Sequence, residues 1–146
     1  MPQHFEKRWL PYAPEQLFAL VADVGRYPEF LPWCLGARMR GRRGDTVTAD
    51  LVVGYKAFRE TFTSVVTLRH PERITVSYVA GPLADLRNEW SFAPGANGGC
   101  DLTFDVDFRF RSFFLSSVMD LFFDKAFRKM VAAFEARAAA LYGKKA

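Results

Sequence analysis

The sequence predicts an α+β fold in which a curved antiparallel sheet packs against one long C-terminal helix. Apolar and polar residues alternate through most of residues 36–111, and prolines and glycines break this alternation at intervals typical of hairpins. Residues 113–142 instead repeat apolar side chains at helical spacing. Strands and helices do not alternate along the chain, which argues against a parallel sheet. The 146 residues fit one domain, residues 1–146.

The N-terminal part predicts a strand followed by two short helical segments. Residues 3–12 carry apolar side chains without helical spacing, which is typical of a strand. Pro14 suits the first turn of a helix that continues towards Gly25. Residues 26–34 contain two prolines four positions apart, so they are expected to form a packed turn or a single helical turn.

The remainder predicts about six consecutive strands and then the long helix. Ser112 is a suitable N-cap for that helix, and Gly143 lies where a helix stop is expected. The alternation is most regular in residues 100–110, where the even-numbered positions are apolar and are expected to face inward. The helix presents one apolar stripe that should pack on the sheet, formed by Leu115, Met119, Phe122, Ala126, Met130, Ala133, Phe134 and Leu141.

Composition narrows the possible functions. Aromatic residues make up 16% of the chain, which suits a ligand cavity or an aromatic-rich core equally well. Cys34 and Cys100 are expected to be free thiols, and with His4 and His70 they offer no zinc-ligand spacing, so we expect no metal. Neither histidine is expected on an inward strand face, which disfavours a nucleophilic triad.

On several predicted strands, polar residues occupy positions of the alternating pattern that are expected to face inward with the apolar residues. Glu60 lies between Phe58 and Phe62 and Ser64 between Phe62 and Val66, and Tyr78 and Asn88 have the same inward phase on later strands. A buried polar group without a partner costs about 1–3 kcal/mol, so each needs a hydrogen-bond partner. Neighbouring backbone or buried water could satisfy them one by one. Together they indicate the polar end of an apolar pocket.

The net charge is +4, with basic clusters that could attract anionic lipid, RNA or an acidic partner. No aromatic residue interleaves the first cluster, and we expect no DNA partner. On the predicted helix, basic residues share one side with two apolar ones, which is typical of contact with anionic lipid or, alternatively, of an ordinary solvated face. The first cluster is Arg38, Arg40, Arg42 and Arg43. The expected membrane contact is formed by Phe114, Leu121, Lys125, Arg128 and Lys129.

The N-terminal residues predict the location of the protein. Glu6, Lys7 and Arg8 interrupt the apolar run that a secretory signal would need, and an Arg-rich, acid-poor leader is not apparent. No stretch reaches the roughly 18 consecutive apolar residues of a spanning helix. We therefore expect a cytoplasmic protein, with peripheral contact to the inner membrane.

Residues 27–34, YPEFLPWC, resemble the YPxFLPWC motif of the coenzyme Q-binding family of START-like domains, in the polyketide cyclase/dehydrase superfamily. Residues 81–90 are similar to that family's GPF…L…W segment, although Leu83 stands where members often carry phenylalanine. Residues 133–143 are similar to the family's C-terminal end. The resemblance covers nearly the whole chain and implies a helix-grip fold of the START or Bet v 1 type.

The resemblance also implies a function. Members bind ubiquinone or a related polyprenyl quinone in support of respiration and quinone synthesis, without catalysis, so we expect ubiquinone as a bound ligand and no cofactor. Some bacterial relatives are instead toxins that block association of ribosomal subunits. A polyketide cyclase or dehydratase would need a pocket acid and base, for which Glu60 and Tyr78 are the candidates. The expected mouth or wall comprises Tyr27, Phe30, Leu31 and Trp33, and the expected interior comprises Tyr78, Asn88, Trp90, Phe122 and Met130.

Overall fold

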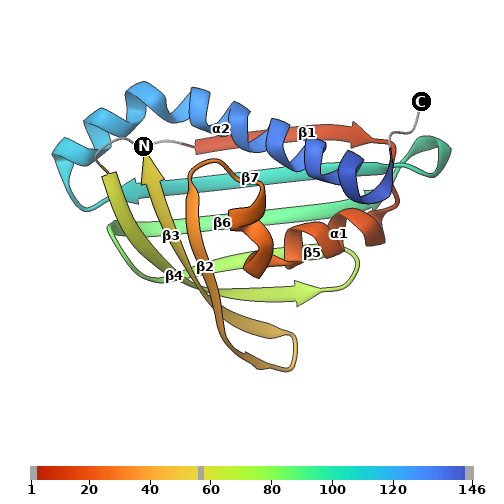
Figure 1. The fold of residues 1–146 in the computed structure, drawn as a ribbon, viewed down its shortest axis with the longest axis horizontal. Helices are drawn as coiled ribbons and strands as arrows, with labels where there is room; N and C mark the ends of the chain where they lie inside the picture. The colour runs from red at the N-terminus through yellow and green to blue at the C-terminus, as the bar shows by residue number, and fades with distance from the viewer. Residues whose placement is uncertain (1–2, 56–57, 144–146) are drawn as a thin grey trace.

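The computed structural model describes the chain over residues 3–55 and 58–143, and the side chains of residues 4–54, 59–112, 117 and 125–143. The N-terminal strand is followed by an α-helix and a 3-10 helix, then by consecutive strands and the long helix (Figure 1). The elements are β1 (Gln3–Leu10), α1 (Pro14–Ala22), η1 (Val24–Glu29), β2 (Cys34–Arg43), β3 (Thr46–Tyr55), β4 (Phe58–Arg69), β5 (Arg73–Ala80), β6 (Leu83–Pro94), η2 (Ala96–Gly98), β7 (Cys100–Phe110) and α2 (Phe113–Tyr142).

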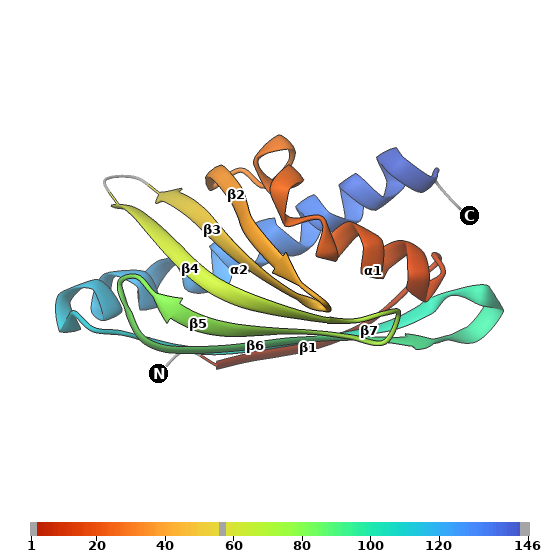
Figure 2. The same ribbon diagram turned by 90° about the horizontal axis from the view of Figure 1, so that it is seen from below.

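The strands form one seven-stranded antiparallel sheet in the order β1-β7-β6-β5-β4-β3-β2. Figure 2 shows both helices on one side of this sheet, with β2 and β3 rising towards them. The sheet therefore curves around α2, as the sequence predicts. Hairpin connections join β2 to β7 in sequence, whereas β1 pairs with the last strand and so brings the N-terminal segment beside α2 (Figure 1).

Strand register lines up the inward residues in rows across the concave face. On β7, the even-numbered residues Cys100, Phe104, Val106, Phe108 and Phe110 are buried and the odd-numbered residues are more exposed, so the predicted alternation is confirmed. Side chains directly opposite each other on one face are close enough to pack together. One row runs from β3 to β1 through Val47, Val66, Val76, Asn88, Val106 and His4.

The C-terminal half of α2 closes the concave face. Phe127, Phe134 and Ala138 lie at positions i, i+7 and i+11, which share one helix face, and they pack in the main core cluster. The stripe predicted from the sequence is wrong at its end, since Leu141 is 52% exposed. Tyr142 turns inward in its place, and its hydroxyl donates a 2.8 Å hydrogen bond to the Gln16 carbonyl oxygen of α1.

The edge strand β1 turns its large apolar side chains outward, whereas their apolar character suggests that they face the core. Phe5 and Trp9 are 64% and 44% exposed, on the outer side. The ring of His4 lies on the helix side, with its centroid 3.6 Å from that of Phe127, so the prediction that His4 avoids an inward face is wrong. Arg8 forms ion pairs with Glu6 on its own strand and with Glu135 on α2. These charged side chains cover the seam between β1 and α2, which an apolar pattern could not reveal.

Gly81 occupies the tight turn between β5 and β6, and alanine should be strongly unfavourable there. Its φ of +145° lies in a region that L side chains rarely adopt, and an added Cβ would lie 2.9 Å from the Thr61 carbonyl oxygen. We expect Gly81→Ala to lower the free energy of unfolding by about 1–3 kcal/mol in urea denaturation. Gly41→Ala is the matched control, because nothing lies within 4 Å of its added Cβ. Equal losses of unfolding free energy in the two variants would contradict a specific requirement for glycine at position 81.

Candidate ligand cavity

A cavity of about 320 Å³ lies between the concave face of the sheet and α2. Its floor comes from alternate residues of β3 to β7, its roof from α2, and one wall from α1, η1 and the segment that follows η1. The lining residues are Val21, Val24, Tyr27, Leu31, Trp33, Ala49, Leu51, Val53, Phe62, Ser64, Val66, Ile74, Val76, Leu83, Leu86, Asn88, Trp90, Phe104, Val106, Phe108, Phe110, Ala126, Phe127, Met130 and Phe134.

The lining is almost entirely apolar and carries no charged side chain among the described residues. Asn88 is the most polar group, and two hydrogen bonds orient it. Its Nδ2 donates to the Asp105 carbonyl oxygen at 3.0 Å, and its Oδ1 accepts from the Trp90 indole Nε1 at 3.1 Å. Trp90 lies two residues from Asn88 on β6, and Asp105 lies on the neighbouring strand β7, next to Val106, the residue that pairs with Asn88. The amide is therefore held in a fixed position in the floor.

The wall residues Tyr27 and Trp33 contribute aromatic surface. The Tyr27 hydroxyl donates to the Val21 carbonyl oxygen at the end of α1, and burial raises the pKa of this phenol well above its usual range. Trp33 holds the segment after η1 to β3, because its carbonyl oxygen accepts a 2.9 Å hydrogen bond from the Gly54 amide. The Trp33 indole Nε1 is buried and lacks a hydrogen-bond partner in the described part of the chain.

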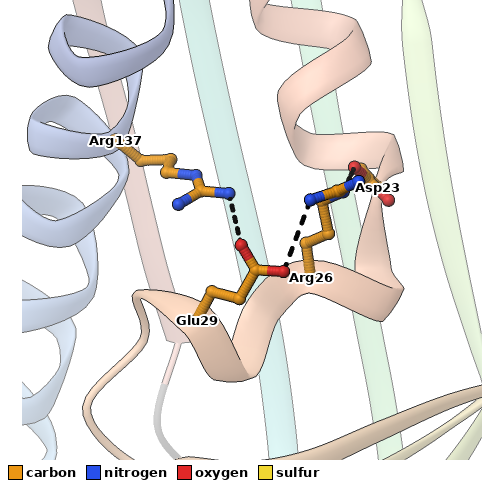
Figure 3. Close-up of polar contacts among 4 residues, drawn as sticks. All are labelled: Asp23, Arg26, Glu29 and Arg137. Carbon is orange, nitrogen blue, oxygen red and sulfur yellow. Dashed lines mark hydrogen bonds and ion pairs between the residues drawn. The ribbon is translucent and has the colours of Figure 1, made fainter.

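An ion-pair chain fastens η1 to α2 beside this wall (Figure 3). Arg137 of α2 donates to the Glu29 carboxylate at 2.8 Å, and Arg26 lies 3.5 Å from the same carboxylate and 3.1 Å from Asp23. The Arg137 guanidinium also lies 5.1 Å from the centroid of the Phe30 ring, within the range of a cation–π contact. The ion pairs and the cation–π contact together hold the motif segment, residues 27–34, against α2.

Cys34 ends the motif segment as a buried thiol. Burial raises its pKa, and burial raises the pKa of Cys100 to about 11. Both thiols are therefore neutral at physiological pH and poor nucleophiles. In the described part of the chain, no three His, Cys, Asp or Glu side chains gather as ligands for a metal ion.

The cavity brings together most of the predicted ligand-binding residues. Tyr27, Leu31, Trp33, Asn88, Trp90 and Met130 line it. Phe30 lies behind the wall, with its ring centroid 5.2 Å from that of Phe134. Tyr78 packs at the sheet end, where its hydroxyl accepts a 2.9 Å hydrogen bond from the Leu83 amide. Phe122 lies outside the described side chains.

The candidate acid and base of a cyclase do not meet in the cavity. Glu60 is exposed, and neither Glu60 nor Tyr78 belongs to its lining. Glu60 shares the face of Phe62 and Ser64, but it is exposed and does not line the cavity, because it lies near the start of β4, before the strand reaches the cavity at Phe62. Sequence reasoning missed Phe127 as a roof residue, although its spacing of seven from Phe134 was a usable signal.

The expected membrane-contact residues are only partly described. Lys125, Arg128 and Lys129 are exposed on α2, whereas the side chains of Phe114 and Leu121 lie outside the described residues. In the part of the chain that the structure describes, the helices are too short or too polar to cross a lipid bilayer.

Comparison with known proteins places these features in context. The model of the polyketide cyclase/dehydrase and lipid transport family matches residues 10–135. The ribosome association toxin RatA of Escherichia coli strain K12 is 33% identical over 142 residues, covering 97% of this chain and 90% of that protein. The mitochondrial coenzyme Q-binding protein COQ10 homolog B of Xenopus laevis is 32% identical over 146 residues. The match spans 97% of this chain and 60% of the Xenopus protein.

Solved structures have the same architecture. The 18 kDa protein CC1736 of Caulobacter crescentus matches with a TM-score of 0.80 and 38% identity, covering 99% of this chain and all of that one. The Zhui aromatase/cyclase of Streptomyces sp. R1128 matches with a TM-score of 0.82 over 94% of this chain and 93% of its own, at 14% identity. At that identity the likeness shows the fold alone. The chain has the predicted helix-grip fold.

Proposed function

We propose, since the chain belongs to the polyketide cyclase/dehydrase and lipid transport family and encloses an apolar cavity, that it binds ubiquinone or a similar polyprenyl quinone. The relatives named coenzyme Q-binding protein support this ligand class. The observation that carries the proposal is the cavity itself, whose described lining is apolar apart from a few fixed polar groups. Such a binding protein would support respiration and quinone synthesis by holding a water-insoluble molecule.

The energetics favour a prenylated ring. Apolar groups gain about 0.8 kcal/mol per CH₂-sized unit when they leave water, so one isoprene unit contributes about 3–4 kcal/mol. The volume of 320 Å³ is at the lower end of the usual range for small-molecule pockets. A cavity of this volume suits a quinone ring with a short length of its prenyl tail. The rest of a long tail would extend through the mouth towards a membrane.

The described lining also favours binding over catalysis. General acid–base catalysis needs a titratable side chain within hydrogen-bond reach of the substrate. Tyr27 is the titratable residue among the described lining residues, and its hydroxyl already donates to backbone while its pKa is raised. We therefore propose a carrier or chaperone that needs no cofactor and leaves its ligand unchanged.

Titration with a short-tailed ubiquinone, followed by tryptophan fluorescence, tests the proposal. We expect saturable quenching, because Trp33 and Trp90 both line the cavity. Trp9→Phe is the control, since Trp9 lies on the outer side of β1 and should contribute little to the quenching signal. A signal that fails to saturate, or one that disappears with Trp9→Phe, would contradict binding in the cavity.

A second candidate function is binding to the large ribosomal subunit, as a toxin that blocks subunit association. Relatives named ribosome association toxin support it, and so does the exposed basic edge of β2. Cosedimentation with large subunits should then be strong at low salt and weaken steeply as salt rises. The residues of that edge are Arg38, Arg40, Arg42 and Arg43.

We also propose a cytoplasmic location with peripheral membrane contact. Lys125, Arg128 and Lys129 are exposed on α2, next to the roof of the cavity at Ala126 and Met130. Basic residues near an anionic bilayer contribute about 1 kcal/mol each. A ligand tail leaving the cavity near this face would meet the membrane directly.

A further inference from the structure

On the floor of the cavity, Ser64 and Asn88 are the described side chains with unused hydrogen-bonding capacity. The other polar lining groups are engaged or covered: the Tyr27 hydroxyl donates to backbone, the Trp90 indole donates to Asn88, and the Trp33 Nε1 is buried. Ser64 lines the cavity from β4, and its hydroxyl forms no hydrogen bond with the described residues. A ligand oxygen inside the cavity would therefore meet these two side chains.

Each of the two groups can both donate and accept. A hydroxyl has one O–H and two lone pairs, and a carboxamide has two N–H groups and two lone pairs. Asn88 uses one N–H on the Asp105 carbonyl and one lone pair on the Trp90 indole. One N–H and one lone pair of Asn88 therefore remain, and Ser64 retains its full capacity.

The sheet register places the two groups on opposite sides of Val76. Val76 of β5 pairs with Asn88 of β6 and with Val66 of β4, and Ser64 lies two residues from Val66 along β4. Ser64 and Asn88 are thus two strands and two residues apart, which corresponds to about 12 Å between their Cα atoms. The concave curvature brings the tips of inward side chains closer together than the Cα atoms.

This spacing suits a six-membered ring with an oxygen on each of two opposite carbons. Each hydrogen bond adds roughly 2.8 Å between heavy atoms, and the ring with its two oxygens fills the remaining space. Val76, on the strand between the two polar groups, offers an apolar side chain to the ring face. A single carbonyl or a hydrocarbon would use one of the two groups or neither.

We infer that Ser64 and Asn88 hold the two ring oxygens of a para-dioxygenated ligand and accept its quinone and quinol forms alike. The inference rests on the proposed function and adds the recognition of the ring. Quinone oxygens accept hydrogen bonds from both side chains, whereas quinol hydroxyls donate to them. No charged side chain in the described lining favours one form over the other.

The test compares three probes on the purified full chain: a short-tailed ubiquinone, its chemically reduced quinol under anaerobic conditions, and an isoprenoid hydrocarbon without oxygen. The wild-type dissociation constants for quinone and quinol should agree within about threefold, well inside the tenfold that corresponds to 1.4 kcal/mol. Ser64→Ala should weaken the binding of both forms by about three- to tenfold, the usual contribution of one hydrogen bond. It should leave hydrocarbon binding unchanged.

Ser77→Ala is the matched control, because Ser77 is exposed on the outer face of β5. Asn88→Leu should act like Ser64→Ala, provided that its circular dichroism and unfolding midpoint show that it remains folded. If wild-type protein binds no quinone, the proposed function fails. If wild-type protein binds quinone and Ser64→Ala changes nothing, or weakens the hydrocarbon equally, the proposed function stands and this inference is overturned. A quinol affinity far below that for quinone would also overturn it.

Discussion

Replacing Ala126 with tryptophan should strongly weaken the binding of a short-tailed ubiquinone while the protein stays folded. Ala126 lies in the roof of the cavity, so an indole at this position would occupy the space that the ligand needs. We expect the dissociation constant to rise at least about tenfold. Filling a void adds packing contacts, so the unfolding midpoint should stay level or rise. Fluorescence titration and thermal unfolding measure the two effects.

Ala132→Trp provides the matched control for this prediction. Ala132 lies on the same helix but is exposed, so the added indole should project into solvent. Binding should then equal that of the wild-type protein. Equal loss of binding in both variants would show that a bulky residue perturbs α2 as a whole. Unchanged binding in Ala126→Trp would place the ligand outside the cavity.

Replacing Phe134 with alanine should cause the largest loss of stability of any single substitution considered. The Phe134 ring centroid lies 5.5 Å from that of Tyr27, 5.2 Å from Phe30 and 5.4 Å from Trp90. Phe134 packs against both hydrophobic clusters of the core and so joins α2 to η1 and to the sheet. We expect a loss of about 3–5 kcal/mol in the free energy of unfolding, measured by urea denaturation.

Leu141→Ala is the control on the same helix, because Leu141 is 52% exposed. Its effect should stay within about 0.5 kcal/mol. A loss below about 1 kcal/mol for Phe134→Ala would mean that the aromatic cluster does not anchor the helix. The motif segment would then be held mainly by the Glu29–Arg137 ion pair.

Much of the fold was predictable because periodicity reports the facing of residues in regular elements. The alternation of β7 and the span of α2 both follow the sequence pattern. The pattern failed on the edge strand β1, where the inward side carries His4 and Arg8 and the outer side carries Phe5. Those side chains are placed by partners on α2, such as Phe127 and Glu135, and a local pattern contains no information about partners distant in sequence.

The presence of an apolar cavity was predictable from the sequence, but the exact set of residues that line it was not. The motif pointed to Tyr27 and Trp33, and the inward polar phase pointed to Asn88, all of which line the cavity. The same phase misplaced Glu60, since alternation shows the face of a residue but not how far the helix extends over it. Whether a side chain such as Phe30 reaches the cavity or lies behind its wall depends on three-dimensional packing with Phe134.

The most direct test of quinone binding is organic extraction of the natively purified protein, followed by mass spectrometry of the extract. The Ala126→Trp variant, purified in the same way, is the reference. We predict a polyprenyl quinone in the wild-type extract, at an amount that scales with protein, and its loss from the variant. A wild-type extract free of quinone, or equal amounts of quinone in both extracts, would contradict binding in the cavity.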